Sequence, residues 1–129
     1  YAHDIEAQDK HKKAKEIVHS FWNDNGALIS TQVLQEFYVN VTKKVPQPLS
    51  LVTARRIVEQ YQVWSVISNT VQNVIRASEI QERYQLSFWD SLIISAAESG
   101  GAKTILSEDL SHNQTIAGIR IEDPLIENS

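Results

Sequence analysis

The sequence contains no cysteine, no methionine and no long apolar run. Without cysteine the chain can form neither a disulfide framework nor a thiolate metal site, which favours an intracellular, cytoplasmic protein. No apolar stretch approaches the roughly 18 residues that a membrane-spanning helix needs, and no signal-peptide pattern is present. The absence of methionine, together with the opening residues Tyr-Ala-His-Asp, leads us to expect that the natural chain begins further upstream.

Basic residues are also in the minority. The chain has 12 lysines and arginines against 16 aspartates and glutamates, a net charge of −4. This balance argues against a general polyanion binder, so nucleic acid would be met by a local basic patch or through metal ions. With 129 residues, 42% of them hydrophobic, the chain has the size and composition of one globular domain, and we expect a single domain over residues 1–129.

The most informative stretch of the sequence predicts a buried helix followed by a short strand. Ser87 is suited to cap the helix, and Asp90 follows at the third position of a capping box. Gly100 and Gly101 supply the turn that ends the helix, and 104–106 is a short β-branched strand. The apolar residues of the helix cover more than one stripe, which indicates burial on most sides: Phe88, Trp89, Leu92, Ile93, Ile94, Ala96 and Ala97.

The rest of the chain alternates between helical and strand-like patterns. Strands alternating with helices are typical of a parallel sheet with helices on both faces, so the predicted fold class is α/β, with three α/β/α layers and a parallel central sheet. Further helices are expected at residues 6–25, 31–42, 51–62 and from a cap at 68–70 to about 84, and further strands at 27–29, 63–67 and 116–121. In the helix that ends near residue 84, the buried side is expected among Val71, Val74, Ile75, Ala77, Ser78 and Ile80.

Three acids occupy equivalent places in this pattern. Glu36 lies in the helix after the second strand, Asp90 begins the buried helix, and Asp109 follows the strand at 104–106. In a parallel sheet these places converge at the carboxyl ends of the strands. Clustered acids without matching cations repel each other, and a divalent cation relieves that repulsion. Oxygen ligands favour Mg²⁺ or Mn²⁺, which can activate water for phosphodiester cleavage.

Each of these acids also has a simpler interpretation. Glu36 lies away from the centre of its helix's apolar stripe and could be a solvated glutamate. Asp90 could serve only as the capping-box acid, and Asp109 could be a turn-forming residue. Glu108 is interpreted as solvated. The sequence pattern alone leaves these alternatives open.

At these residues the sequence resembles the PIN-domain ribonucleases, and within them the VapC-like toxins of toxin–antitoxin pairs. The resemblance spans essentially the whole chain and rests on several motifs in order. Residues 30–36, Ser-Thr-Gln-Val-Leu-Gln-Glu, resemble the second motif of the family, residues 87–93 the third, and residues 106–110 the Ser-x-Asp motif. Tyr1-Ala2-His3-Asp4 resembles the tail of the family's first segment.

The resemblance implies a metal-dependent nuclease with Glu36, Asp90 and Asp109 as ligands of Mg²⁺ or Mn²⁺. The first aspartate of the family pattern is absent, and by resemblance it would lie upstream of Tyr1 on a central strand. The resemblance also implies a homodimer and an antitoxin partner that blocks the cleft. Basic residues around the cleft would position the RNA backbone, with Lys10, Lys13, Lys43 and Lys44 as candidates.

The sequence therefore leads to a main hypothesis and two alternatives. The main hypothesis is a Mg²⁺- or Mn²⁺-dependent endoribonuclease of PIN-like fold that acts on RNA as the toxin of a toxin–antitoxin pair. One alternative is a non-catalytic PIN-like binding module whose acids are structural. The other is an unrelated Mg²⁺-dependent phosphate enzyme with a doubly wound fold.

Overall fold

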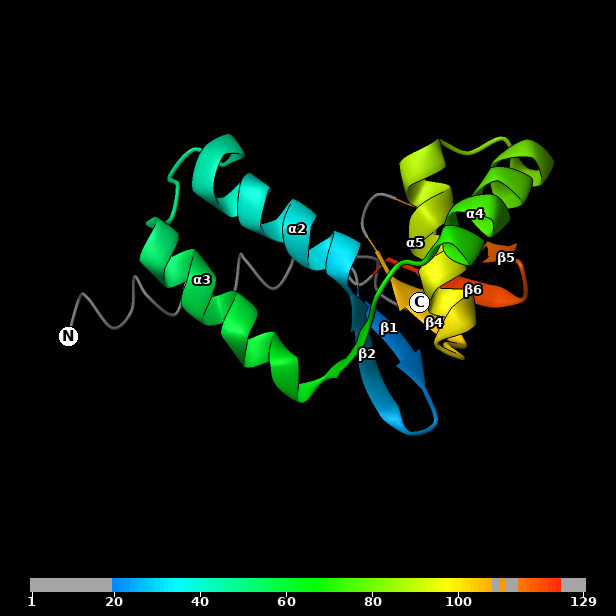
Figure 1. The fold of residues 1–129 in the computed structure, drawn as a ribbon, viewed down its shortest axis with the longest axis horizontal. Coiled ribbons are helices and arrows are strands. Elements are labelled where there is room, and N and C mark those ends of the chain that lie inside the picture. The colour runs from blue at the N-terminus through cyan, green and yellow to red at the C-terminus, as the bar shows by residue number, and fades with distance from the viewer. Residues whose placement is uncertain (1–19, 108–109, 111–113, 124–129) are drawn as a thin grey trace.

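The computed structural model describes residues 20–107, 110 and 114–123, and it contains one six-stranded sheet in the order β3-β2-β1-β4-β6-β5 (Figure 1). The strands are β1 (Ser20–Asn23), β2 (Gly26–Ser30), β3 (Ser65–Ile67), β4 (Thr104–Leu106), β5 (Thr115–Ile116) and β6 (Ile119–Glu122). The helices are α2 (Thr31–Val39), α3 (Leu51–Gln60), α4 (Val71–Tyr84) and α5 (Phe88–Ser99). A π-helical turn at Asn40–Lys44 extends α2, and a 3-10 turn at Tyr61–Val63 extends α3.

The sheet is mostly parallel by strand direction. β2 pairs with β3, and β4 with β6, in parallel, whereas β1 runs antiparallel to both of its neighbours, β2 and β4. β2, β3, β4 and β6 therefore share one direction, and their carboxyl ends lie at the same edge. The predicted α/β fold class is confirmed, with a central sheet and packed helices consistent with a three-layer α/β/α architecture.

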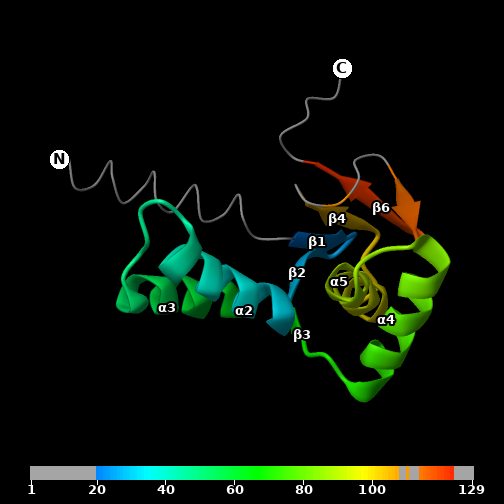
Figure 2. The ribbon, with the colours of Figure 1, turned by 90° about the horizontal axis from the view of Figure 1, so that it is seen from above.

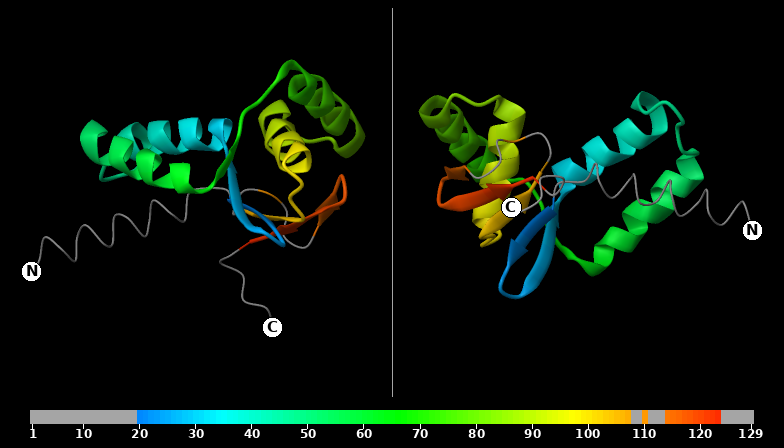
Figure 3. Two further views of the ribbon diagram at one scale, coloured as in Figure 1. Left: turned by 60° about the horizontal axis from the view of Figure 1, so that its bottom comes forward. Right: turned by 180° about the vertical axis from the view of Figure 1, so that it is seen from behind.

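Helix α5 packs on one face of the sheet, and α4 packs on the outside of α5 (Figures 2 and 3). This face carries Phe21, which pairs with Leu28 on β2 and Ile105 on β4. The contact is close at the end of α5, because a Cβ added to Gly100 would collide with the Ile67 side chain. A larger residue at position 100 would require the Ile67 side chain to move.

The pair of helices α2 and α3 lies beside the β2–β3 side of the sheet (Figure 2). Trp22 alternates with Phe21 along β1, so it points to the face opposite α5. Its ring lies 6.0 Å from that of Trp64, which makes an edge contact of 4.9 Å with Tyr61. Tyr61 in turn contacts Phe37 on α2 at 6.3 Å. These ring contacts connect α2 and α3 to the second face of the sheet, and burial raises the pKa of the Tyr61 phenol.

The helix predicted to be buried on most sides is confirmed. Every residue from 91 to 97 of α5 is buried, including Ser91 and Ser95. A helix can bury seven consecutive residues only if it is covered on all sides, here by the sheet and by α4. One residue departs from the prediction, because the Trp89 side chain is 62% exposed. It lies in the first turn of α5, beyond the part that α4 and the sheet cover.

The face that α4 turns toward α5 contains Ala77 and Ile80 from the predicted set and, in addition, Asn73. Asn73, Ala77 and Ile80 are buried there, whereas three expected core residues are exposed. The prediction followed the more apolar stripe, but α5 offers polar partners that favour the stripe containing Asn73. The exposed fractions are 73% for Val71, 46% for Val74 and 52% for Ile75.

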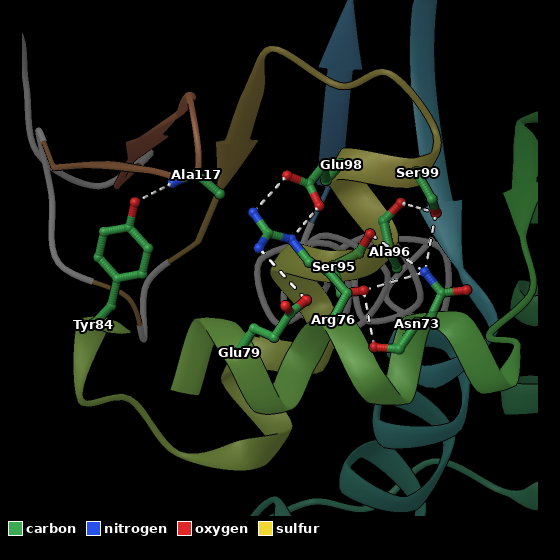
Figure 4. Close-up of polar contacts among 9 residues, drawn as sticks. All are labelled: Asn73, Arg76, Glu79, Tyr84, Ser95, Ala96, Glu98, Ser99 and Ala117. Atoms are coloured by element: carbon green, nitrogen blue, oxygen red, sulfur yellow. Dashed lines mark hydrogen bonds and ion pairs between the residues drawn. The ribbon is translucent and has the colours of Figure 1, made fainter. Parts of the chain in front are cut away.

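Asn73 is the centre of the polar contact between α4 and α5 (Figure 4). Its Nδ2 donates to Ser95 Oγ and Ser99 Oγ, each at 3.2 Å, and Ser95 Oγ donates to the Asn73 carbonyl at 3.0 Å. Its Oδ1 accepts from the backbone N–H of Thr70 at 2.9 Å and completes a capping box at the start of α4. The side chain thus satisfies buried groups on both helices.

Two further contacts hold this helix pair in place (Figure 4). Arg76 donates from Nε and Nη2 to the two carboxylate oxygens of Glu98, at 2.8 and 3.1 Å, and this hydrogen bonding raises the pKa of the Arg76 guanidinium. The hydroxyl of Tyr84 accepts from the backbone N–H of Ala117 at 3.1 Å and ties the end of α4 to the β5–β6 turn. α4, α5 and the sheet edge are therefore connected by directional contacts.

The predicted helix over residues 6–25 is wrong at its end, where Ser20–Asn23 form β1. β1 and β2 make a hairpin whose two-residue turn is Asp24-Asn25, followed by Gly26 at φ +124°. An Asp-Asn-Gly turn favours a hairpin, and the short strand gains ladder hydrogen bonds on both sides. The earlier part of the predicted helix, residues 6–19, lies outside the described residues.

The predicted strand over residues 116–121 is also corrected. It is a hairpin of β5 and β6 with a turn at Ala117-Gly118, both of which have positive φ, +52° and +80°. Such paired left-handed residues match the twist of a tight hairpin. In the part of the chain that the structure describes, no helix is long and apolar enough to span a membrane.

Replacing Asn73 with Ala should lower the free energy of unfolding by about 2 kcal/mol, because the Thr70 N–H loses its acceptor and the Ser95 and Ser99 hydroxyl oxygens lose their donor. Urea unfolding should show a lower midpoint with an unchanged slope. Glu79→Ala, which changes an exposed residue on the same helix, is the control and should alter stability by less than about 0.5 kcal/mol. Equal effects of the two changes would contradict the role of Asn73 in joining the helices.

Candidate metal centre

Buried polar residues line the edge of the sheet where the parallel strands end. β2 ends at Ser30, β4 leads into Ser107, and β1 begins at Ser20, which pairs with Leu106. Each serine hydroxyl accepts a hydrogen bond: Ser20 Oγ from the Trp22 indole at 2.9 Å, Ser30 Oγ from a backbone N–H of α2 at 3.1 Å, and Ser107 Oγ from that of Leu110 at 3.2 Å. These bonds hold the loops that leave the sheet at this edge.

Glu36 reaches this edge from α2. Ser30 caps the helix through the N–H of Val33, which starts α2 directly at the end of β2. One turn before Glu36, the amide of Gln32 donates from Nε2 to Glu36 Oε1 at 3.0 Å. The glutamate is half-buried. The simpler interpretation of Glu36, a fully solvated helix residue, therefore does not describe the structure.

Asp90 reaches the same region from the first turn of α5. Ser87 caps the helix by accepting from the Asp90 N–H at 3.1 Å, a bond that any residue at position 90 could form. The reciprocal bond of a capping box is not formed, and among the described residues the Asp90 carboxylate makes no hydrogen bond or ion pair. The helix N-terminus gives it only the general benefit of an acid near the positive end of the dipole. Capping alone therefore gives a weak reason for an acid here.

A single side chain connects the two acidic positions. Besides its bond to Glu36, Gln32 Nε2 donates to the backbone carbonyl of Trp89 at 3.1 Å. Trp89 directly precedes Asp90, so the amide holds the Glu36 carboxylate against the turn that carries the second acid. Figure 1 shows that α2 and α5 both begin at the edge of the sheet where the parallel strands end. The structure thus places Glu36 beside the turn of α5 that carries Asp90.

Gln32 itself was not identified from the sequence. It is 5% exposed, and its Oε1 is buried without a hydrogen-bond partner. The amide cannot turn over to correct this, because both groups that Nε2 contacts are acceptors. A buried unpaired oxygen costs free energy, so this residue favours the site at the expense of stability. The signal available in the sequence was its i, i+4 spacing from Glu36.

Asp109 and Glu108 lie outside the described residues, so their predicted places stay predictions. Among the described residues there is no group of three or more His, Cys, Asp or Glu side chains that could together hold a metal ion. The two acids that are described fit a hard divalent cation by donor chemistry, since both offer carboxylate oxygen and neither forms an ion pair in the described chain. A third ligand is required to complete such a site.

The basic residues expected around the cleft are less well placed. Lys43 and Lys44 are exposed in the π-helical turn after α2. They follow Glu36 by seven and eight residues, which is roughly 10 Å or more along the helix axis. Lys10 and Lys13 lie outside the described residues. Contact of Lys43 or Lys44 with RNA would therefore involve a part of the substrate away from the acids.

The sheet centre departs from the family pattern to which the sequence is similar. In that pattern a central strand carries the first aspartate. Here the place between β2 and β4 is occupied by β1, Ser-Phe-Trp-Asn, which has no carboxylate.

Comparison with known proteins gives one match. The family model for the PIN domain matches residues 1–116 of the 129. The matched residues contain both acids at the carboxyl edge, Glu36 and Asp90, as well as Asp109. A search of curated proteins finds no match.

Replacing Gln32 with Leu tests how Gln32 holds the site. The change removes two hydrogen bonds and also one unpaired buried oxygen, so the free energy of unfolding should stay within about 1 kcal/mol of the parent. Mn²⁺ binding, measured by calorimetry, should weaken because Glu36 is no longer held toward α5. Gln35→Leu, an exposed change on the same helix, should leave Mn²⁺ binding unchanged. Unaltered Mn²⁺ affinity in the Gln32 variant would show that Gln32 does not position Glu36.

Proposed function

The chain belongs to the PIN domain family, and from that membership we propose that it is a Mg²⁺- or Mn²⁺-dependent endoribonuclease. Glu36, Asp90 and Asp109 are the proposed metal ligands. The observation that carries the proposal is the Gln32 amide, which connects the Glu36 carboxylate to the turn containing Asp90. Membership of the family removes the third hypothesis, an unrelated phosphate enzyme of doubly wound fold.

The chain's own residues provide orientation and charge. A bound divalent ion would supply an activated water and stabilise the charge that develops on the phosphate. Gln32 keeps one carboxylate oxygen of Glu36 directed toward α5. The N-terminal turn of α5 adds positive potential beside the site, which favours an anionic substrate. No side-chain nucleophile is needed for this reaction.

Two carboxylates without a nearby cation explain why a metal would bind here. In the described chain neither Glu36 nor Asp90 has a lysine or arginine partner, whereas Glu98 is paired with Arg76 and Asp24 with Lys103. Repulsion between Glu36 and Asp90 would be relieved by the ion, which links metal binding to stability. The fourth carboxylate that the family resemblance predicts stays a prediction.

We further propose that the protein acts in the cytoplasm as the toxin of a toxin–antitoxin pair and forms a homodimer. Support comes from the apolar residues that α4 leaves exposed, Val71, Val74 and Ile75. They follow one helical stripe at i, i+3 and i+4, the spacing by which a helix contacts another protein. An antitoxin segment could cover apolar helical surface and place a basic side chain against the acids.

Replacing Asp90 with Asn separates catalysis from capping. The Ser87 cap uses the backbone N–H of residue 90 and survives the change, so only the dipole interaction, about 0.5 kcal/mol, is lost. Reduced repulsion between the acids should offset that loss, so the thermal stability of the metal-free protein should hold or rise. Mn²⁺-dependent RNA cleavage should fall to background.

Glu98→Gln is the matched control, since it removes a carboxylate of the same helix that is paired with Arg76 rather than free. It should lower stability modestly and leave the chemistry of cleavage intact. An Asp90→Asn protein that melts earlier and still cleaves RNA at the parent rate would reject the ligand assignment. A parent protein that neither binds Mn²⁺ nor cleaves RNA would favour the non-catalytic binding module, whose acids are structural.

Replacing Ile75 with Asp tests the proposed protein contact. A charge in the exposed stripe should abolish self-association or binding of the proposed antitoxin, because burying an unpaired carboxylate is costly. Size-exclusion chromatography with light scattering gives the readout. Gln81→Asp adds the same charge to another exposed position of α4 and should have no effect. Identical masses for the parent and the Ile75 variant, with the partner still bound, would exclude this stripe as an interface.

A further inference from the structure

Trp89 is an exposed aromatic side chain beside a candidate ligand. It is 62% exposed, although tryptophan is highly buried on average. It lies in the first turn of α5, next to Asp90. In contrast, the other two tryptophans, Trp22 and Trp64, contact each other at the second face of the sheet. Packing of the core therefore does not explain why a tryptophan stands at position 89.

The position of Trp89 is fixed by contacts on both its backbone and its ring. Its carbonyl accepts from Gln32 Nε2 at 3.1 Å, and that same nitrogen donates to Glu36. Its ring makes an edge contact with the ring of Phe88, at 5.3 Å between centroids and 78° between planes. The amide therefore holds the backbone of Trp89 beside Glu36, and the exposed ring extends from that point against the ring of Phe88.

The charge of the protein makes an uncharged contact with nucleic acid valuable. The net charge is −4, and Lys43 and Lys44 lie well along α2 from Glu36. Two carboxylates at the site also repel phosphate until a cation is bound. Stacking of a base on an aromatic ring does not depend on charge and accepts any base, since every base has a flat face. A ring beside the acids would supply affinity that the surface charge does not.

We propose that Trp89 is the stacking platform for an unpaired nucleobase next to the phosphodiester bond that is cleaved. The ligand class is thus a single-stranded nucleotide segment, with one base on the indole while the neighbouring phosphate faces Glu36 and Asp90. A base within a duplex has both faces occupied by its neighbours, so the site selects unpaired segments. This inference rests on the proposed nuclease function for the identity of the neighbouring bond.

The test combines a change in the protein with a change in the RNA. A short single-stranded oligoribonucleotide is compared with copies in which one base at a time is removed to leave an abasic residue. Binding is followed by the fluorescence anisotropy of an end-labelled oligoribonucleotide with Ca²⁺ in place of Mg²⁺, and single-turnover cleavage is measured separately with Mn²⁺. The fluorescence arm does not need cleavage, so it remains informative if the nuclease proposal fails.

In the parent protein, one abasic position next to the cleaved bond should weaken binding by about tenfold. Trp89→Leu should weaken binding of the intact oligonucleotide by a similar factor, and the abasic copy should then show no further loss. Trp89→Phe, which keeps a flat ring, should restore most of the affinity. Trp22→Phe removes an indole from the opposite face of the sheet and should leave the abasic effect unchanged.

Three outcomes would overturn the inference. Equal abasic losses in the parent and in Trp89→Leu would show that the base stacks elsewhere. Unchanged RNA binding in Trp89→Leu with altered self-association would assign the ring to a protein contact. Equal binding of single-stranded and duplex RNA by the parent would exclude selection of unpaired bases. An abasic effect that depends on Trp89 in a protein that cleaves no RNA would support the stacking site and reject the nuclease function.

Discussion

The arrangement of the molecule depends on the burial of α5. Seven consecutive residues of this helix are buried, so the sheet must cover one side and α4 another. Gly100 allows the end of the helix to lie against Ile67, and Asn73 supplies the polar contacts that α4 needs at the buried serines. Once α5 is enclosed in this way, only its two ends remain accessible, and its first turn carries Trp89 and Asp90.

The candidate site follows from this constraint and from the direction of the strands. β2 ends at the same edge as β4, and the Ser30 cap starts α2 there without a connecting loop. Glu36 therefore lies within reach of the first turn of α5, and one amide is enough to join them. Two helices that are far apart in sequence meet at this edge, and each of them begins at a serine cap. The caps are local features of the chain, whereas the meeting is a property of the fold.

Local patterns predicted the helices α2 to α5 and the strands β2, β3 and β4, but not β1 or the β5–β6 hairpin. The caps and apolar spacing of α2, α3, α4 and α5 are sufficient for their placement, as are the apolar runs of β2 and β4. β1 was missed because Phe21 and Trp22 fit a helical stripe as well as a strand, and only pairing with two neighbours decides between them. The β5–β6 hairpin was missed because Ala117 in a left-handed conformation has no sequence signal. Glu36 and Asp90 were identified by resemblance and position, whereas Gln32 requires the tertiary contact to Trp89.

The residues at which local expectation fails are themselves informative. A sequence that specifies one fold normally agrees with it at every level, and departures tend to occur where function requires them. Gln32 buries an unpaired oxygen, and it is the residue that connects Glu36 to the backbone next to Asp90. Trp89 is exposed where the helix pattern predicts burial, and it lies beside one of those acids. A core optimised for stability alone would have neither feature, so their occurrence at the same turn of α5 supports a ligand site there rather than a purely structural acidic cluster.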